Sequence, residues 1–507
     1  MTDTQPTVRT DSGLLRGRVQ HGMASFLGVP FAEAPTGAQR FAAPEPVRPW
    51  SGERTADRLG PVCPQVATYG PVGTAATSHL EQGENFLTLN VRTPDPDGRA
   101  PVLVWVHGGG YAVGSGAEPV LQSGAFARSG VVEVTVNYRL GALGFLYLGE
   151  DVPANRGLLD QIAALRWVHE NIAQFGGDPS NVTLAGRSAG GFAVATLMAM
   201  PGAKGLFQRA LVQSGASPAV ITVETAENIT SLFCRELGVK ARQIPDVPTE
   251  DLLRVQKSLC DDAYTRFRPE VYGDVAVLGL PFQPVVDGVT LPETPERAIA
   301  RGFALDVDLM IGTTTGEAVT HTSIHDEMTD AEAARLVHPR LVPLGLTGQD
   351  IVSAYRELLP EHTGKGLLTE ITGDLVFQLP TSRFAAAQSG HARVFKYLYG
   401  EHEPNGAGAR HGAEVGYIWR NPDGPAPDVP ERFVPTDPEL ADSVHTTWAA
   451  FVSGGSPETP HMPHWPPHSP SEPTLVRIDG TGFHLEPDIY WPRLAMWEKG
   501  GAAHPGQ

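Results

Sequence analysis

The pentapeptide Gly186–Gly190, with the sequence GRSAG, places Ser188 at the centre of a turn between two glycines. It follows the apolar run Val182–Ala185, which is typical of a buried strand, and precedes the helix-forming run Ala193–Met198. A strand, a sharp turn and a helix in this order form a nucleophile elbow, in which the turn lifts the serine hydroxyl clear of the sheet. The helix N-terminus beneath it favours developing negative charge. We therefore predict that Ser188 is a nucleophile; the alternative is an ordinary glycine-rich connection.

A second glycine-rich segment, His107–Gly110 (HGGG), follows the apolar run Val102–Val106. Glycines let neighbouring backbone N–H groups point at one spot with no side chain in the way, as the oxyanion of an acyl-transfer reaction requires. We expect the donors to be Gly109, Gly110 and the N–H group of Ala189. A plain turn after a strand is the alternative, but the elbow further along the chain favours an oxyanion hole.

A serine hydroxyl becomes a good nucleophile only when a base accepts its proton. Of the 17 histidines, His391, His402 and His411 flank the predicted core strand Val394–Tyr399. His391 precedes this strand, and His402 follows it too closely, in a charged turn. His411 ends a loop of small residues that can carry its side chain over the sheet. We therefore predict that His411 is the base.

The acid that orients the imidazole should follow another late strand. Glu317 comes shortly after the apolar run Leu305–Ile311, at the end of the segment Met310–Glu317. A solvated loop carboxylate is the more common fate of a glutamate and is the alternative here. The position after a strand favours Glu317 as the acid.

The candidates above follow predicted strands, so a sheet must hold them. Between residues 101 and 214 the apolar patterns alternate between strands and helices, which predicts an α/β fold with a mostly parallel sheet and helices on both faces. We expect the first 100 residues to form a smaller flanking sheet, residues 222–270 and 326–360 to be mainly helical, and residues 457–473 to form a surface loop. The expected core strands are residues 102–106, 131–138, 181–184, 210–213, 305–311 and 394–399, and the expected helices are residues 158–175 and 189–200.

The chain has 507 residues and a formal net charge of −19. Because the chemical motifs extend from its first quarter to its last fifth, we expect one catalytic domain over residues 1–507. An acidic surface repels phosphate backbones, which argues against nucleic acid as a partner. Because no segment is long and apolar enough to cross a membrane and the first residues lack a basic region followed by an apolar one, we expect neither a membrane span nor a secretory signal. The three cysteines lack metal-ligand spacing. We expect a monomeric cytoplasmic protein that uses no metal and no cofactor.

Several longer segments resemble the type-B carboxylesterase family, which includes bacterial p-nitrobenzyl esterases and the cholinesterases. The resemblance covers nearly the whole chain and implies the α/β-hydrolase fold with long helical insertions. It also implies the triad Ser188, Glu317 and His411, with the oxyanion donors named above. The segments that carry it are Phe26–Ala32 (FLGVPFA), Asn137–Phe145 (NYRLGALGF), Gly157–Gln161 (GLLDQ), Phe175–Thr183 (FGGDPSNVT), Gln213–Gly215 (QSG), Pro284–Gly288 (PVVDG), Gly312–Glu317 (GTTTGE) and Gly408–Glu414 (GARHGAE).

Three departures from the family's pattern matter for function. The residue before the nucleophile is Arg187, where the family usually has a glutamate. The family's partner for Cys63 in a disulfide is missing, because residues Glu84–Leu87 have the sequence ENFL. No counterpart of the choline-binding tryptophan of the cholinesterases lies between residues 66 and 83. A choline ester is therefore not the expected substrate.

The resemblance also implies residues around the triad. Glu414 has the spacing from His411 of a family carboxylate that lies near the residue before the nucleophile. We therefore predict an ion pair between Arg187 and Glu414 behind the triad, with Ser214 nearby. The alternative is that Arg187 points unpaired into the pocket and favours substrates with an anionic tail. Two further ion pairs carried over from the family are Arg40–Glu84 and Arg139–Asp160.

An acyl pocket is expected beside the segment 277–282. Leu278 and Leu280 stand there where the cholinesterases carry bulky aromatic residues that restrict the acyl group. The smaller leucines predict tolerance of acyl groups larger than acetyl. The alternative is that both leucines belong to the ordinary apolar core.

Together these features predict a serine esterase that hydrolyses small-molecule carboxylic esters to acid and alcohol through an acyl-enzyme. One alternative is a non-enzymatic adhesion protein, since the family includes members that kept the fold and lost the triad. The complete set of triad residues and glycines argues against it. Another alternative is a hydrolase of carbamates, lactones or amides, because the same catalytic groups serve those substrates too.

Overall fold

A mixed sheet of eleven strands forms the centre of the molecule, in the order β18-β17-β16-β15-β12-β11-β9-β10-β8-β4-β3. The computed structural model describes residues 5–20, 22–69, 72–73, 80–216, 219–322, 328–401, 408–420, 429 and 433–499. Seven neighbouring strands of this sheet, from β17 to β10, run parallel to one another. Their bounds are Ala100–Val106 (β9), Val132–Val136 (β10), Gly177–Arg187 (β11), Arg209–Gln213 (β12), Asp308–Thr314 (β15), Val394–Tyr399 (β16) and Thr474–Asp479 (β17).

The parallel strands follow the predicted core strands closely, because their apolar residues are buried between layers of helices. All residues of β10 and β16 are buried, as expected for parallel strands covered on both faces. The starts of two strands differ most from the prediction: β11 begins at Gly177, four residues before the expected start at Asn181, and β15 begins later than expected. The strand β15 begins at Asp308, whereas Leu305 lies before it with a side chain that is 53% exposed.

Only part of the first 100 residues forms the predicted smaller flanking sheet. Strands β3 (Arg18–Gln20), β4 (Met23–Pro30) and β8 (Thr88–Thr93) extend the main sheet in antiparallel fashion beyond β10. Every residue of β8 is buried, so this strand is stabilised by packing inside the main sheet. Strands β1 (Thr7–Thr10), β2 (Gly13–Arg16) and β5 (Glu53–Thr55) form a small separate sheet, and β6 (Thr68–Tyr69) pairs with β7 (Val72–Gly73) in another. The other edge of the main sheet is β18 (Gly482–Pro487), which is antiparallel to β17.

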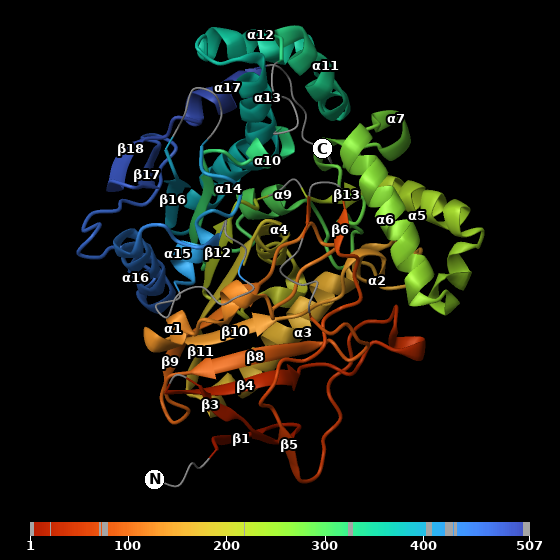
Figure 1. Ribbon diagram of the computed structural model, residues 1–507, viewed down its shortest axis with the longest axis vertical. Coiled ribbons are helices and arrows are strands. Elements are labelled where there is room, and N and C mark those ends of the chain that lie inside the picture. Colours follow the sequence, from red (N-terminus) through yellow and green to blue (C-terminus); the bar gives the residue numbers. More distant parts are fainter. Residues whose placement is uncertain are drawn as a thin grey trace.

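Helices cover the sheet and form long insertions beyond it. Figure 1 shows α5 to α7 gathered on one side of the molecule and α11 to α13 at the end opposite the N-terminal strands. Helices α5 and α6, with the start of α7, fall in the predicted helical region 222–270, and α11 and α12 fall in 326–360, whereas α13 lies beyond the predicted regions. Their starts carry side-chain caps: Thr222 caps α5, and Thr329 with Glu332 forms a capping box on α11. Among the described residues, no helix could span a lipid bilayer.

The helices have the following bounds: α1 Ala125–Arg128, α2 Gly141–Phe145, α3 Arg156–Asn171, α4 Ala189–Leu197, α5 Val223–Leu237, α6 Thr249–Arg266, α7 Pro269–Tyr272, α8 Val275–Leu278, α9 Pro295–Ala300, α10 Val319–Thr322, α11 Asp330–Leu341, α12 Gly348–Leu358, α13 Gly364–Gly373, α14 Leu379–Ser389, α15 Val415–Ile418, α16 Pro438–Gly454 and α17 Trp491–Lys499. A π-helical turn, η7 (Asp374–Gln378), joins α13 to α14.

The strand register brings the carboxyl ends of the central strands to one edge of the sheet. Arg187 at the end of β11 lies opposite Gln213 at the end of β12, which in turn lies opposite Gly312 in β15. On the other side of β11, Gly186 lies opposite Val106 at the end of β9. The strand order reverses at β9, since β10 lies on one side of it and β11 on the other. Ligands of open α/β sheets bind outside the carboxyl ends of strands at such a reversal.

Candidate active site

Ser188 occupies the sharp turn between β11 and α4. Its backbone angles are φ 58° and ψ −128°, a conformation that a non-glycine residue adopts only when its surroundings enforce it. The Ser188 N–H group donates a hydrogen bond to the carbonyl oxygen of Gln213 at 2.9 Å. A Cβ atom on Gly190 would lie 2.1 Å from the carbonyl oxygen of Val106, and one on Gly186 would lie 2.5 Å from the carbonyl carbon of Gly190. Close backbone packing thus explains both glycines of the motif.

The HGGG segment lies directly against this turn. A Cβ atom on Gly108 would be 3.2 Å from the Cβ atom of Ser188. Gly109 and Gly110 both have positive φ angles, 110° and 60°, which favour glycine. Ala189 is the first residue of α4, so its N–H group has no acceptor within the helix. The three residues predicted to donate to an oxyanion therefore belong to two segments that adjoin Ser188.

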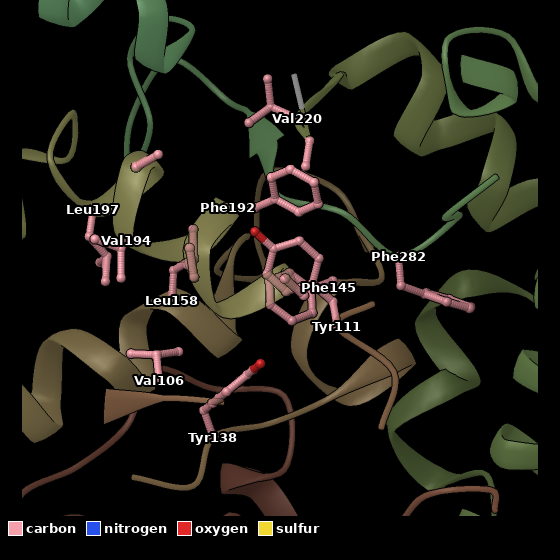
Figure 2. Close-up of a cluster of buried hydrophobic side chains, with 14 of the residues drawn as sticks. Val106, Tyr111, Tyr138, Phe145, Leu158, Phe192, Val194, Leu197, Val220 and Phe282 are labelled. Atoms are coloured by element: carbon pink, nitrogen blue, oxygen red, sulfur yellow. The ribbon is translucent and has the colours of Figure 1, made fainter. Parts of the chain in front are cut away.

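Aromatic side chains hold the HGGG segment in place. The His107 ring stacks on Tyr138 with 4.4 Å between centroids, and the Tyr138 hydroxyl donates to the His107 carbonyl oxygen at 2.9 Å. Burial lowers the pKa of His107 to about 4, so this histidine is neutral. After the glycines, Tyr111 packs on Phe145 at 4.7 Å. Figure 2 shows Tyr111 and Phe145 in one buried cluster with Phe192 of α4. A shared core thus anchors both the glycine segment and the helix after Ser188.

Glu317 and His411 meet at this edge of the sheet. The Nδ1 atom of His411 lies 2.5 Å from the Oε2 atom of Glu317, whose side chain is fully buried. The other carboxylate oxygen of Glu317 accepts a hydrogen bond from the Thr314 N–H group at 2.8 Å. The two loops are also joined through the backbone, since Gly316 N–H donates to the Ala409 carbonyl oxygen at 2.8 Å. A carboxylate on Nδ1 keeps a proton on that nitrogen and leaves Nε2 as the basic atom.

The two other histidines considered for the base differ in placement. The Nε2 atom of His391 lies 3.3 Å from the carbonyl oxygen of Ala300, at an exposed position beyond the end of α14. This position is at the opposite end of β16 from the loop that carries His411. His402 lies outside the described residues.

The π-helical turn η7 was not predicted from the sequence, and it contacts the base and the segment that holds the acid. The Phe377 ring lies 4.8 Å from the His411 ring between centroids. Gln378 Nε2 donates to the carbonyl oxygen of Thr314 at 2.8 Å, and its Oε1 atom accepts a hydrogen bond from Thr313. The only signal in the sequence is Pro380 within an otherwise helical run, which marks an interruption but not its contacts.

Glu414 is fully buried next to this acid–base pair. Its Oε1 atom accepts a hydrogen bond from Gln213 Nε2 at 3.2 Å. Burial, and then the nearby charge of Glu317, raise the pKa of Glu414 to about 7, although Arg187 and Gln213 oppose the rise. The neighbouring Ser214 hydroxyl is buried too and has no hydrogen-bond partner among the described residues. Behind His411 the site therefore contains a second carboxyl group that is partly protonated near neutral pH.

The raised pKa of Glu414 makes the stability of the fold depend on pH. The folded state binds this proton more tightly than the unfolded chain, so the associated stability is complete below a pH of about 4.5 and is lost as the pH rises through about 7. At about 1.4 kcal/mol per pKa unit, the loss approaches roughly 3 kcal/mol. Glu414→Gln cannot titrate, so the variant should gain stability relative to the parent between pH 5 and pH 8. Urea unfolding at both pH values measures this, and parallel pH dependences would contradict it.

Arg187 does not form the predicted ion pair with Glu414. Among the described residues it has no acidic partner within 4.0 Å; its guanidinium lies 5.6 Å from the centre of the Phe433 ring and packs on Gly412. The physical reason is the burial of Glu414, whose carboxylate is turned toward Gln213. The half-buried Arg187 acts on Glu414 only through its charge, which lowers the pKa of that carboxyl. Arg187 directly precedes Ser188 in the sequence, and Gly412 directly follows His411. The contact between Arg187 and Gly412 therefore joins the segment of the nucleophile to that of the base.

This contact predicts the effect of adding a methyl group beside the base. A Cβ atom on Gly412 would lie 2.5 Å from an Arg187 guanidinium nitrogen, at a φ of 79°. Gly412→Ala should lower kcat by about 10- to 100-fold, because small displacements of a catalytic group have effects of that size. Gly345→Ala is a matched control, since Gly345 has a φ of 71° and open space around its Cβ position. The expectation would be refuted if Gly412→Ala and Gly345→Ala lowered the Tm equally and both kept the kcat of the parent.

The two ion pairs carried over from the family differ in outcome. The prediction for Arg139 and Asp160 is confirmed: their side chains are fully buried, with an N–O distance of 2.6 Å. The prediction for Arg40 and Glu84 is wrong. Arg40 donates instead to the carbonyl oxygen of Val247 at 2.6 Å and so holds a helical insertion rather than a carboxylate. No ion pair joins it to Glu84, although both are described residues.

The leucines of the expected acyl pocket lie at and just beyond the end of the short helix α8. Leu278 is 5% exposed and belongs to the main hydrophobic core, whereas Leu280 is partly buried against it. Of the two, Leu280 therefore has more surface available to a substrate. Across the described part of the chain, no group of three or more His, Cys, Asp or Glu residues could hold a metal ion.

The sequence and the fold both match known esterases. A profile of the Carboxylesterase family matches residues 4–497. The chain is 36% identical over 470 residues to the para-nitrobenzyl esterase of Bacillus subtilis strain 168, covering 90% of this chain and 91% of that one. It is 32% identical over 519 residues to the phenmedipham hydrolase of Pseudarthrobacter oxydans, covering 96% and 98%. A solved PNB esterase structure superposes with a TM-score of 0.83 at 34% identity, covering 97% of this chain and 99% of that chain. The chain therefore belongs to the carboxylesterase family, and it is a serine-type carboxylic ester hydrolase with the α/β-hydrolase fold.

Proposed function

We propose that the chain cleaves small-molecule carboxylic esters by a two-step acyl transfer on Ser188, with His411 as base and Glu317 as the acid of the triad. The observation that carries this proposal is the 2.5 Å contact between His411 Nδ1 and Glu317 Oε2. It lies at the same sheet edge as a serine held in a strained turn. An oriented imidazole beside a serine in a nucleophile elbow is what acyl transfer requires.

In the first step, His411 accepts the proton of Ser188 as its Oγ atom attacks the ester carbonyl carbon. Glu317 stabilises the imidazolium that forms. The N–H groups of Gly109, Gly110 and Ala189 donate to the tetrahedral oxygen, where they stabilise charge that develops only in the transition state. His411 then protonates the leaving alcohol. Water attacks the acyl-enzyme in the same way and releases the acid.

We further propose that Arg187, Ser214 and Glu414 support the triad without touching the substrate. Arg187 packs on Gly412 and Phe433, so it braces the turn that follows His411. Its positive charge partly offsets the negative charge that Glu317 and Glu414 place behind the imidazole.

We propose that one chain suffices for activity, because Ser188, Glu317 and His411 all come from the same chain. A reducing compartment such as the cytoplasm fits the three free cysteines, Cys63, Cys234 and Cys260.

A series of chromogenic substrates tests the proposed activity. Acetyl, butyryl and benzoyl esters of p-nitrophenol should be hydrolysed with kcat/KM values at least about 10²-fold above those of the corresponding p-nitroanilides and of a p-nitrophenyl carbamate. We propose that Leu280, which is only partly buried, lines the acyl pocket with Leu278 behind it, and that these side chains accept larger acyl groups. Butyryl and benzoyl esters should then be preferred over acetyl. A carbamate or anilide cleaved as well as the esters would contradict the substrate class. An acetyl preference would contradict the acyl-pocket assignment alone.

A further inference from the structure

The C-terminal helix α17 inserts a buried cation into the layer of helices above the site. Arg493 Nη1 lies 2.7 Å from Glu370 Oε2 and 3.0 Å from Asp374 Oδ2. The Tyr355 hydroxyl donates a hydrogen bond to Asp374 at 2.5 Å. The same hydroxyl accepts a hydrogen bond from Trp497 Nε1 at 2.9 Å. All five side chains are buried. The cluster therefore joins α12, α13 and α17 to the first residue of the π-helical turn η7.

The last two residues of η7, Phe377 and Gln378, contact the proposed catalytic residues or their supporting segments. The centroid of the Phe377 ring lies 4.8 Å from that of His411 and 6.3 Å from that of Phe192 in α4. The planes of the two phenylalanine rings differ by 10°. Gln378 binds the backbone of Thr314, whose N–H group donates to Glu317. One turn thus contacts the base, the segment that holds the acid and the helix that follows the nucleophile.

The sequence explains why this turn needs an anchor. Pro380 lacks an N–H group and its ring crowds the carbonyl group of Val376, four residues earlier, so a regular α-helix cannot continue through this point. The π-helical turn widens the backbone before Pro380. Such turns are rare and short, and they occur often at functional sites. The ion pair at Asp374 holds the first residue of this short turn, only three and four residues before Phe377 and Gln378.

We propose that Arg493 is a positioning residue for ester hydrolysis. Through Asp374 it fixes the π-helical turn, and the turn fixes Phe377 against His411 and Gln378 against the segment that orients Glu317. This proposal rests on the catalytic roles proposed above. It adds that the C-terminal helix, which contributes none of the proposed catalytic residues, helps to align the base.

Charge-changing variants at both ends of the ion pair test this role. Asp374→Asn keeps the shape of the side chain and removes its charge, whereas Arg493→Met removes the cation and Arg493→Lys restores it. Asp374→Asn and Arg493→Met should lower kcat by about 10- to 100-fold, with KM changed less than about twofold, and should shift the acidic limb of the pH profile of kcat/KM. Arg493→Lys should recover most of the kcat. Phe377→Leu should shift the same limb, because it removes the ring that contacts His411.

Glu133→Gln provides the matched control. Glu133 in β10 forms a buried ion pair with Arg92 at 3.2 Å, and both residues are far in sequence from Asp374 and Arg493. It should lower the Tm while leaving kcat and the pH profile unchanged. If Asp374→Asn behaves like this control, the cluster only stabilises the fold and the positioning role is overturned. Arg493→Met leaves two carboxylates unpaired and can unfold the protein, but Asp374→Asn and Arg493→Lys decide the question without it. An active Ser188→Ala variant in the same assay would overturn the triad instead, so the two failures are distinguishable.

Discussion

Ser188→Ala should lower kcat for ester hydrolysis by at least about 10⁴-fold, while KM changes little. Without the hydroxyl no acyl-enzyme can form, and the remaining rate comes only from binding and from the oxyanion donors. The fold should persist, because alanine can occupy the same strained backbone conformation, which is enforced by the packing of Gly186 and Gly190. The measurement is kcat under saturating p-nitrophenyl ester, together with Tm for both proteins.

A serine elsewhere on the surface controls for the substitution itself. Ser456 is only partly buried beyond the end of α16, where it contacts Glu458, so Ser456→Ala should retain full activity. If Ser188→Ala kept more than about a tenth of the parent kcat at an unchanged Tm, the nucleophile would have to be another residue.

Glu317→Gln should lower kcat at pH 7 by about 10⁴-fold, the loss typical of an acid-to-amide change in such a triad. The amide N–H group of the substituted side chain would donate to His411 Nδ1, which would force the ring proton onto Nε2 and remove the base. The amide oxygen can still accept the hydrogen bond from Thr314, so the Tm should change little. Kinetics and thermal unfolding of the same preparation check both parts.

An exposed glutamate provides the comparison for this change. Glu439 lies in the first turn of α16, and Glu439→Gln should leave kcat within about twofold of the parent value. A loss of less than tenfold in Glu317→Gln would show that Glu317 does not orient the base, and Glu414 would then be the carboxylate to test.

The parts of the site that were predictable from the sequence depend on short-range sterics. Backbone atoms within a few ångströms leave no room for a side chain at Gly186 or Gly190. The glycines around Ser188 therefore indicate the tight turn directly. The same holds for Gly109, whose Cβ would lie 2.0 Å from the carbonyl oxygen of Val113. The strands that precede these motifs are buried on both faces, and their apolar runs identify them.

The features that sequence analysis missed depend on contacts between distant segments. Nothing in the pattern of residues 88–93 indicates that β8 pairs with β10 inside the main sheet. The failed Arg187–Glu414 pair has the same origin, because the burial of Glu414 is set by β12 and the loop that follows β16, not by its spacing from His411. The π-helical turn also escaped prediction, since its first residue, Asp374, contacts Arg493, more than a hundred residues later in the chain.

The most direct test of the proposed mechanism is the mass of the protein after reaction with a fluorophosphonate ester, followed by peptide mapping. The reagent phosphonylates a serine only where a base and an oxyanion hole activate it. We predict one adduct per chain, located on Ser188, absent in Ser188→Ala and formed much more slowly in His411→Ala. An adduct on a different serine, or full labelling of Ser188→Ala, would contradict the assignment of Ser188 as the nucleophile.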